Sequence, residues 1–159
     1  MSDAIERVCV SVNSVCNLKC SYCYFFAKPD ALPGPASLTA EEIGTILENI
    51  HRYSLRPEVD KRIKVNFVGS GEPLLSWTAI RTAVERLHAT AQGHRVRFYM
   101  VTNGVLLTEK IIAEMQAIGL SPSVSLDGPA SLHDLDRVRH NGRGSHADVS
   151  TGPCAGSPK

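Results

Sequence analysis

Short stretches of alternating apolar and polar residues recur along the chain, and each is rich in β-branched or aromatic residues. A period of two with such residues at the apolar positions is typical of β-strands. The valine-rich run RVCVSVN is the first of these stretches. The pattern predicts strands at 7–13, 62–68, 95–101 and 122–126.

Helical periodicity fills the intervals between these strands. Thr39 and Glu42 form a capping-box pattern, and the apolar residues behind it have helical spacing, which predicts a helix over 40–53. A second helix is indicated by apolar residues with the same spacing, Trp77, Ile80, Val84 and Leu87. A third is predicted between Thr108, a typical N-cap, and Gly119, a typical C-cap.

Strands that alternate with helices of this length predict an α/β fold with right-handed crossovers and a parallel sheet. The pattern weakens after residue 140, and the final segment STGPCAGSPK has no periodicity. We therefore expect one folded domain over 1–149 and a disordered tail over 150–159.

An unusual motif follows each predicted strand directly. A cysteine loop follows the first strand, GSGEP the second and TNG the third, while the fourth strand runs into SLDGP. The carboxyl ends of parallel strands are where α/β folds build their sites. We therefore expect these motifs to meet in one functional site.

Composition narrows the expected partners and compartment. Hydrophobic residues make up 43% of the chain and charged residues 21%, and the formal net charge is +1. This balance gives no electrostatic reason to expect a nucleic acid or a membrane surface as partner. No apolar run approaches the roughly 20 residues of a spanning helix, and the N-terminus MSDAIERV lacks the pattern of a secretory signal. The sequence therefore predicts a cytoplasmic protein without membrane or nucleic-acid partners.

Cys16, Cys20 and Cys23 give the chain its most specific chemistry. They form a CxxxCxxC loop directly after the first strand, and the chain has 5 cysteines in all. An odd count and a tight cluster favour metal binding over a disulfide framework. Three thiolates on one loop are able to hold three corners of an iron–sulfur cluster and leave the fourth iron open to a ligand.

Other interpretations of the three cysteines remain at this point. A structural zinc site normally takes four ligands, and both Cys9, inside a predicted strand, and Cys154, in the predicted tail, are poor candidates for the fourth. A histidine is the remaining candidate, from His51, His88, His94, His133, His140 and His146. Buried free thiols are a further alternative.

The CxxxCxxC loop, with the aromatic Tyr22 before its last cysteine, resembles that of the radical S-adenosylmethionine (radical SAM) enzymes. This resemblance implies a TIM-like partial (β/α) barrel and a 4Fe–4S cluster on Cys16, Cys20 and Cys23. It further implies reductive cleavage of S-adenosylmethionine to a 5′-deoxyadenosyl radical, with Tyr22 beside the cofactor. The family barrel has six β-α units, whereas this chain provides about four, so we expect the barrel to stop early.

The motifs after the second and third strands extend the resemblance. Gly69, Gly71 and Glu72 lie in GSGEP, which resembles the GGEP motif that contacts the amino group of the methionine moiety. Because Ser70 separates the glycines, either of them is a candidate for the match. Asn103 lies in a TNG that borders the cofactor pocket in the family, although Asn-Gly alone favours an ordinary turn.

The motif after the fourth strand resembles the one found in the branch of the radical SAM family that modifies peptides and proteins, which includes anaerobic sulfatase-maturing enzymes. There, residues that match Ser125 and Arg137 contact the cofactor, and an arginine suits its carboxylate. His133 and Asp134 are expected at a solvated helix start. The resemblance implies a peptide or protein substrate and an electron donor such as a flavodoxin or ferredoxin.

The resemblance stops short of a complete enzyme. The usual cysteine-rich extension has no counterpart, since Cys154 is alone, and no catalytic acid or base is assigned. We expect a truncated product, a chain that associates with itself or a second subunit at the open barrel edge, or one that binds cofactor without turnover. A non-catalytic cluster- or zinc-binding module is the alternative function.

Overall fold

A parallel sheet of four strands, in the order β1-β2-β3-β4, forms the centre of the molecule. We analysed a computed structural model, which describes residues 4–23, 25, 37–68, 70–91 and 95–152. Neighbouring strands pair in parallel throughout. The strands are β1 (Arg7–Ser11), β2 (Ile63–Val68), β3 (Val96–Thr102) and β4 (Leu120–Val124). The α/β architecture expected from the alternating pattern is confirmed.

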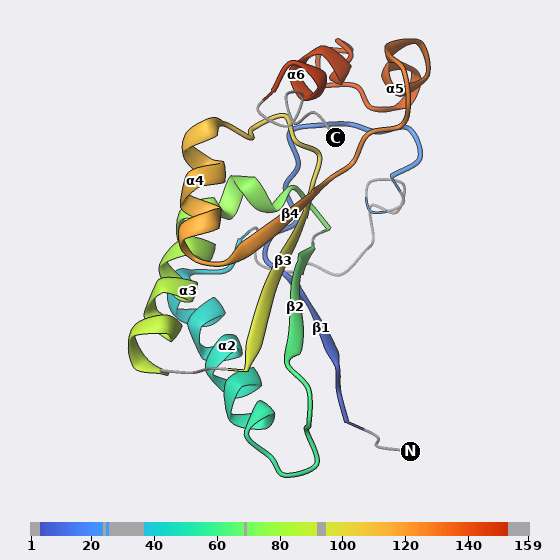
Figure 1. The fold of residues 1–159 in the computed structure, drawn as a ribbon. Coiled ribbons are helices and arrows are strands. Elements are labelled where there is room, and N and C mark those ends of the chain that lie inside the picture. Colours follow the sequence, from blue (N-terminus) through green and yellow to red (C-terminus); the bar gives the residue numbers. More distant parts are fainter. Residues whose placement is uncertain (1–3, 24, 26–36, 69, 92–94, 153–159) are drawn as a thin grey trace, which may run out of the picture.

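Helices cover one face of this sheet and one of its ends. Figure 1 shows one group of helices along a single face and a group of short helices beyond the carboxyl ends of the strands. The first group comprises α2 (Ala40–Ser54), α3 (Trp77–Thr90), which a 3-10 turn η1 (Pro73–Ser76) precedes, and α4 (Glu109–Ala117). The second comprises α5 (Ala130–Asp136) and α6 (His146–Ser150). The other face of the sheet has no helix across it among the described residues.

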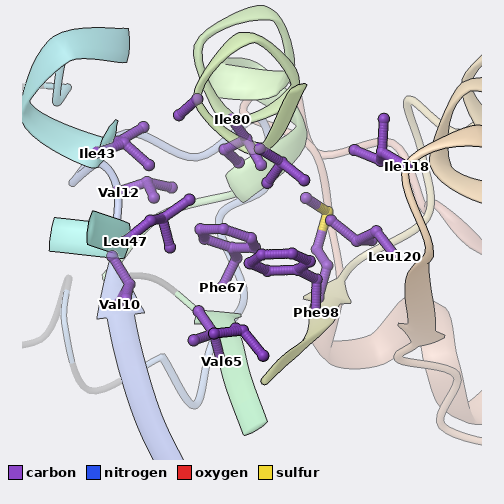
Figure 2. Close-up of a cluster of buried hydrophobic side chains, with 14 of the residues drawn as sticks. Val10, Val12, Ile43, Leu47, Val65, Phe67, Ile80, Phe98, Ile118 and Leu120 are labelled. Carbon is purple, nitrogen blue, oxygen red and sulfur yellow. The ribbon is translucent and has the colours of Figure 1, made fainter. Parts of the chain in front are cut away.

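The hydrophobic core lies between the sheet and the three helices on its covered face (Figure 2). Phe67 of β2 and Phe98 of β3 stack with ring centroids 6.2 Å apart. Leu47 of α2 and Ile80 of α3 are fully buried in the same cluster. Burial of a large apolar side chain contributes about 1.5–3 kcal/mol, so this layer holds the strands in register and fixes where their carboxyl ends lie.

The predicted elements lie within about two residues of the observed ones, and the fourth strand is displaced at both ends. It was expected at 122–126 and instead spans Leu120–Val124. Gly119 adopts a left-handed φ of 65° directly after α4, so the chain turns at once and the strand begins at Leu120. The capping box of α2 is confirmed, since Thr39 Oγ1 accepts from Glu42 N and the Glu42 carboxylate accepts from Thr39 N.

The C-terminal boundary is only partly described. Helix α6 ends at Ser150, and residues 153–159, which include Cys154, lie outside the described residues. The tail over 150–159 therefore stays a prediction. In the described part of the chain, none of the helices has the length and apolar character needed to cross a bilayer.

Candidate functional site

The predicted site residues come together at the carboxyl ends of the strands, around a hollow of about 200 Å³. Every one of the four strand ends contributes to it. The lining residues are Cys16, Leu18, Cys20, Val68, Gly71, Glu72, Val101, Thr102, Asn103, Ser125 and Arg137. Cys23 and Tyr22 are not among them, and Gly69, also predicted at the cofactor, lies outside the described residues.

The cysteine loop is held in place by the segment that follows α5. Backbone hydrogen bonds run from Lys19 N to Val138 O at 2.7 Å and from Ser21 N to Asp136 O at 3.0 Å. Directly before the first of these anchors, Leu18 is buried, with 1% of its surface exposed. The loop that carries the cysteines is thereby fixed by residues more than a hundred positions further along the chain.

Burial disfavours the ionised form of two thiols of the loop, Cys16 and Cys20. Burial raises the pKa of Cys16 and of Cys20, although for Cys20 the nearby Arg137 guanidinium opposes the shift. The Cys16 sulfur accepts from Leu18 N at 3.4 Å and lies 3.8 Å from Asn103 Nδ2. These donors suit a metal-bound thiolate, which needs N–H groups directed at the sulfur.

The three cysteines of the loop are the candidate metal ligands of the chain. Across the described ranges, no group of three or more His, Cys, Asp or Glu side chains is placed to hold one metal ion. A zinc ion requires its ligands within about 2.0–2.3 Å of a single point, whereas an iron–sulfur cubane has several metal corners that each take one thiolate. The metal group that Cys16, Cys20 and Cys23 would hold stays a prediction.

Gly71 and Glu72 join the end of β2 to the rest of the site. A Cβ on Gly71 would lie 2.1 Å from Val15 O and 2.3 Å from Asn13 Oδ1, so only glycine fits. The Glu72 carboxylate is buried and accepts from Thr102 Oγ1 at 2.6 Å, Asn103 N at 2.8 Å and Leu74 N at 3.0 Å. Burial raises the pKa of Glu72 despite these donors. Glu72 thus positions the end of β3, with its carboxylate already occupied by the chain.

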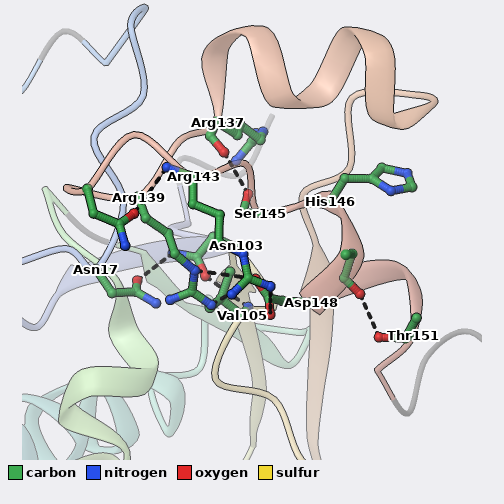
Figure 3. Close-up of polar contacts among 12 residues, drawn as sticks. Asn17, Asn103, Val105, Arg137, Arg139, Arg143, Ser145, His146, Asp148 and Thr151 are labelled. Atoms are coloured by element: carbon green, nitrogen blue, oxygen red, sulfur yellow. Dashed lines mark hydrogen bonds and ion pairs between the residues drawn. The ribbon is translucent and has the colours of Figure 1, made fainter.

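Asn103 connects the third strand end to the cysteine loop. Its Nδ2 donates to Asn17 Oδ1 at 2.8 Å, and its Oδ1 accepts from Val105 N at 3.0 Å (Figure 3). The side chain therefore holds two loops at a fixed separation across the hollow. Sequence reasoning missed Asn17, for which the only signal was its place inside the cysteine loop.

Arg137 reaches the hollow from beyond α5 and is held by Asp127. The Arg137 Nε lies 2.7 Å from Asp127 Oδ2, which also accepts from the Tyr22 hydroxyl at 2.8 Å. The guanidinium carbon stands 5.6 Å from the centre of the Tyr22 ring. Tyr22 is 53% exposed and contacts this pair rather than the hollow, and burial raises its pKa to about 12. In the sequence, Asp127 stands out only as part of the SLDGP motif, and its role as the partner of Arg137 and Tyr22 was not predicted.

The expectation that His133 lies at a solvated helix start is wrong, because its side chain is buried. It is 1% exposed, its Nδ1 accepts from Asp127 N at 3.2 Å, and its Nε2 lies 3.0 Å from Ser145 Oγ. Because the Ser145 hydroxyl donates to Arg137 O at 2.7 Å, His133 Nε2 carries the proton toward Ser145. Asp134 is half-buried and accepts from His146 N at 2.8 Å. The neutral imidazole therefore fixes the backbone on both sides of the Asp127–Arg137 pair.

We expect His133→Asn to flatten the dependence of stability on pH between 7.5 and 5. Burial lowers the pKa of His133 in the folded state, with Arg137 and His146 acting in the same sense and Asp127 and Asp134 in the opposite sense. The unfolded chain then binds the proton more readily, so wild-type stability falls as pH drops below about 6.5. Denaturant unfolding of wild type and His133→Asn at several pH values measures this. Equal slopes for wild type and His133→Asn would contradict the assignment.

Comparison with known proteins agrees with this geometry. The model of the Radical SAM superfamily matches residues 10–149. A serine-type anaerobic sulfatase-maturating enzyme of Bacteroides thetaiotaomicron is 26% identical over 142 residues, which are 89% of this chain and 34% of that protein. A GTP 3′,8-cyclase of Mycobacterium sp. is 34% identical over 149 residues, which cover 92% of this chain and 38% of that protein.

Solved structures show the same fold. The structure of anSMEcpe with bound AdoMet superposes with a TM-score of 0.75 at 22% identity, over 92% of this chain and 38% of that chain. The structure of BtrN with AdoMet and 2-DOIA gives a TM-score of 0.64 over 82% of this chain and 49% of that chain. The fold is therefore that of the TIM-like barrels of these proteins, and the chain spans roughly a third to a half of the length of the relatives it matches.

Proposed function

Because this chain belongs to the radical SAM superfamily, we propose that it holds a 4Fe–4S cluster on Cys16, Cys20 and Cys23 and binds S-adenosylmethionine in the hollow beside them. When bound and reduced, the cluster supplies one electron that breaks the sulfonium carbon–sulfur bond, giving methionine and a 5′-deoxyadenosyl radical. The chain's own part is to bind, orient and shield these groups.

The observation that supports this proposal is the set of residues around the hollow. Two cysteines of the loop line it together with Gly71, Asn103 and Ser125, which come from the other three strand ends, and with Arg137, which follows α5. Gly71 lines the hollow with its backbone, which is where the amino group of the methionine moiety would approach. Arg137, held in place by Asp127, presents a guanidinium to its carboxylate. Asn103 and Ser125 border the rest of the cofactor.

We place the substrate among peptides or proteins. Two relatives are anaerobic sulfatase-maturating enzymes, and one neighbouring structure, anSMEcpe, contains AdoMet together with a peptide. Turnover would require an electron donor of the flavodoxin or ferredoxin type, and the open sheet would accommodate a second copy or subunit. We place the reaction in the cytoplasm. The substrate, the electron donor, the second subunit and the location are proposed for an activity like that of the full-length relatives, and this chain matches a part of their length.

Anaerobic reconstitution with iron and sulfide tests the proposal. The full chain should bind about four iron atoms, its electron paramagnetic resonance signal after reduction should shift when S-adenosylmethionine is added, and 5′-deoxyadenosine should form. Iron binding without 5′-deoxyadenosine would favour the alternative considered above, a cluster-binding module without turnover. One zinc and no iron per chain would contradict the proposed function.

A further inference from the structure

The helix-free face of the sheet carries cationic side chains that do not line the candidate cofactor site. Alternate residues of each strand point to this face, and on β1 to β3 they begin with a cation at the amino-terminal end. The residues of this face are Arg7, Cys9, Ser11, Lys64, Asn66, Val68, Arg97, Tyr99, Val101, Ser121 and Ser123. None of them is a carboxylate, so among the described strand residues this face is polar and basic.

Three of these cations form a row across neighbouring strands. Arg7 pairs in register with Lys64, and Lys64 with Arg97. Strands lie about 4.8 Å apart, so the three side chains start from adjacent positions and repel one another. All three are exposed, and the described residues give none of them an ion pair, whereas nearby Glu6 pairs with Lys61 at 3.0 Å. The row is a concentration of positive charge without an internal counterion among the described residues.

A hollow of about 240 Å³ lies at this row. Arg7 and Lys64 line it at one end, and Asn66 and Tyr99 line it further along the strands. The buried side-chain oxygen of Asn66 has no hydrogen-bond partner in the part of the chain that the structure describes. Buried acceptors are almost always paired in proteins, so this amide is available to a donor such as a peptide N–H. The hollow thus offers cations for an anion and an acceptor for a neighbouring donor.

The basic hollow is continuous with the candidate cofactor site. Val101 of β3 lines both hollows, and along β2 the step from Lys64 in one to Val68 in the other is four residues. At about 3.3 Å per residue, the cation lies roughly 13 Å from the cofactor side. A substrate whose reacting atom lies beside the cofactor would therefore contact the cationic row through a group roughly 13 Å away from that atom.

We propose that the hollow at Arg7 and Lys64 is a subsite for a carboxylate of the substrate, and that the substrate is an acidic peptide. The Arg7 guanidinium and Lys64 ammonium bind the carboxylate, with Arg97 adding to the field, and Asn66 accepts from a peptide N–H next to it. The assignment of this ligand to the substrate rests on the proposed function. The binding itself rests on the charges, register and hollow alone.

Two blocked pentapeptides test the subsite, Gly-Ala-Glu-Ala-Gly and its counterpart with glutamine in the centre. Both are titrated into the reconstituted full chain and followed by nuclear magnetic resonance, including the Arg7 and Arg97 side-chain Nε–H signals. The acidic peptide should bind wild type about tenfold more tightly than the glutamine peptide. The double variant Arg7→Gln with Lys64→Gln should lose this preference, and its melting temperature should not fall, because the repulsion in the row is relieved.

A matched control removes the same charge elsewhere. Arg86→Gln with Lys110→Gln changes two exposed cations on α3 and α4, on the covered side of the sheet. This control should keep the preference for the acidic peptide. A preference that survives in the Arg7 and Lys64 variant, or that the control loses equally, would overturn the subsite.

The test separates failure of the subsite from failure of the proposed function. Discrimination between the two peptides does not depend on iron or on S-adenosylmethionine. A chain that binds no iron but still prefers the acidic peptide would retain the subsite and lose the proposed function. A chain that forms 5′-deoxyadenosine but binds both peptides equally would retain the function and lose the subsite.

Discussion

Replacing Cys20 by alanine is expected to abolish stable iron loading, so that reconstituted protein retains almost no iron and forms no 5′-deoxyadenosine. Cys20 lines the hollow on a loop that supplies three thiolates, and loss of one of them leaves a second corner of the cluster without a protein ligand. Iron and sulfide content per chain after gel filtration under anaerobic conditions is the measurement. The effect should be close to all or none.

Cys9→Ala is the matched control for this experiment. Cys9 is an exposed thiol in the middle of β1, outside the CxxxCxxC loop. The same chemical change there should leave iron content and 5′-deoxyadenosine formation near wild type. Thermal unfolding of both variants checks that the fold is intact, since changes at partly exposed sites are usually worth less than about 0.5–1 kcal/mol. Full iron loading of Cys20→Ala would refute the ligand assignment.

Replacing Gly71 by alanine is expected to lower the free energy of unfolding by about 3 kcal/mol or more. The added methyl would lie 2.1 Å from Val15 O and 2.6 Å from Val15 N, both backbone atoms that cannot rotate away. Relief requires the first-strand loop to move, and with it the hydrogen bond from Glu72 N to Val15 O at 2.8 Å. Urea unfolding measures the change, and any folded fraction should lose the spectroscopic response to S-adenosylmethionine.

Gly44→Ala gives the opposite result for the same substitution. Gly44 lies in the second turn of α2, and nothing lies within 4 Å of a Cβ placed on it. Alanine inside a helix is about 0.5–1 kcal/mol more favourable than glycine, so this variant should be slightly more stable than wild type. If Gly71→Ala were as harmless as Gly44→Ala, the close packing of the second strand end on the cysteine loop would be wrong.

Local periodicity made the elements and the position of the site predictable from sequence. The alternation of apolar and polar residues in 62–68 and 95–101 is a local pattern, so the strands can be recognised from neighbouring residues alone. Parallel pairing of these strands then brings their carboxyl ends to one edge of the sheet. That is why Gly71, Asn103 and Ser125 could be gathered in advance around Cys16 and Cys20, whereas Arg137, which follows α5, was expected there only from the family resemblance. Their roles as ligands stay predictions, because the geometry brings them together without defining what each one binds.

The errors arose where distant residues decide the environment. His133 follows SLDGP like a polar helix start, but Ser145 and Asp127 close around it, and these contacts leave no local pattern. Asp127 in the same motif has the composition of an ordinary turn, so its role as partner of both Arg137 and Tyr22 was not visible. The start of β4 differs for a local reason, since the left-handed Gly119, expected as the C-cap of the preceding helix, sets where the chain turns.

The bracing of the cysteine loop by the segment after α5 has a consequence for how the protein is made. The hydrogen bond between His140 Nε2 and Cys16 O joins residues 124 positions apart. At a synthesis rate of about 5–20 residues per second, the brace is translated roughly 6–25 s after the first cysteine. During that interval the nascent thiols are unsupported, open to oxidants and to whichever metal arrives first. Delivery of the proposed iron–sulfur cluster is therefore expected to be post-translational, after residues 136–140 have left the ribosome.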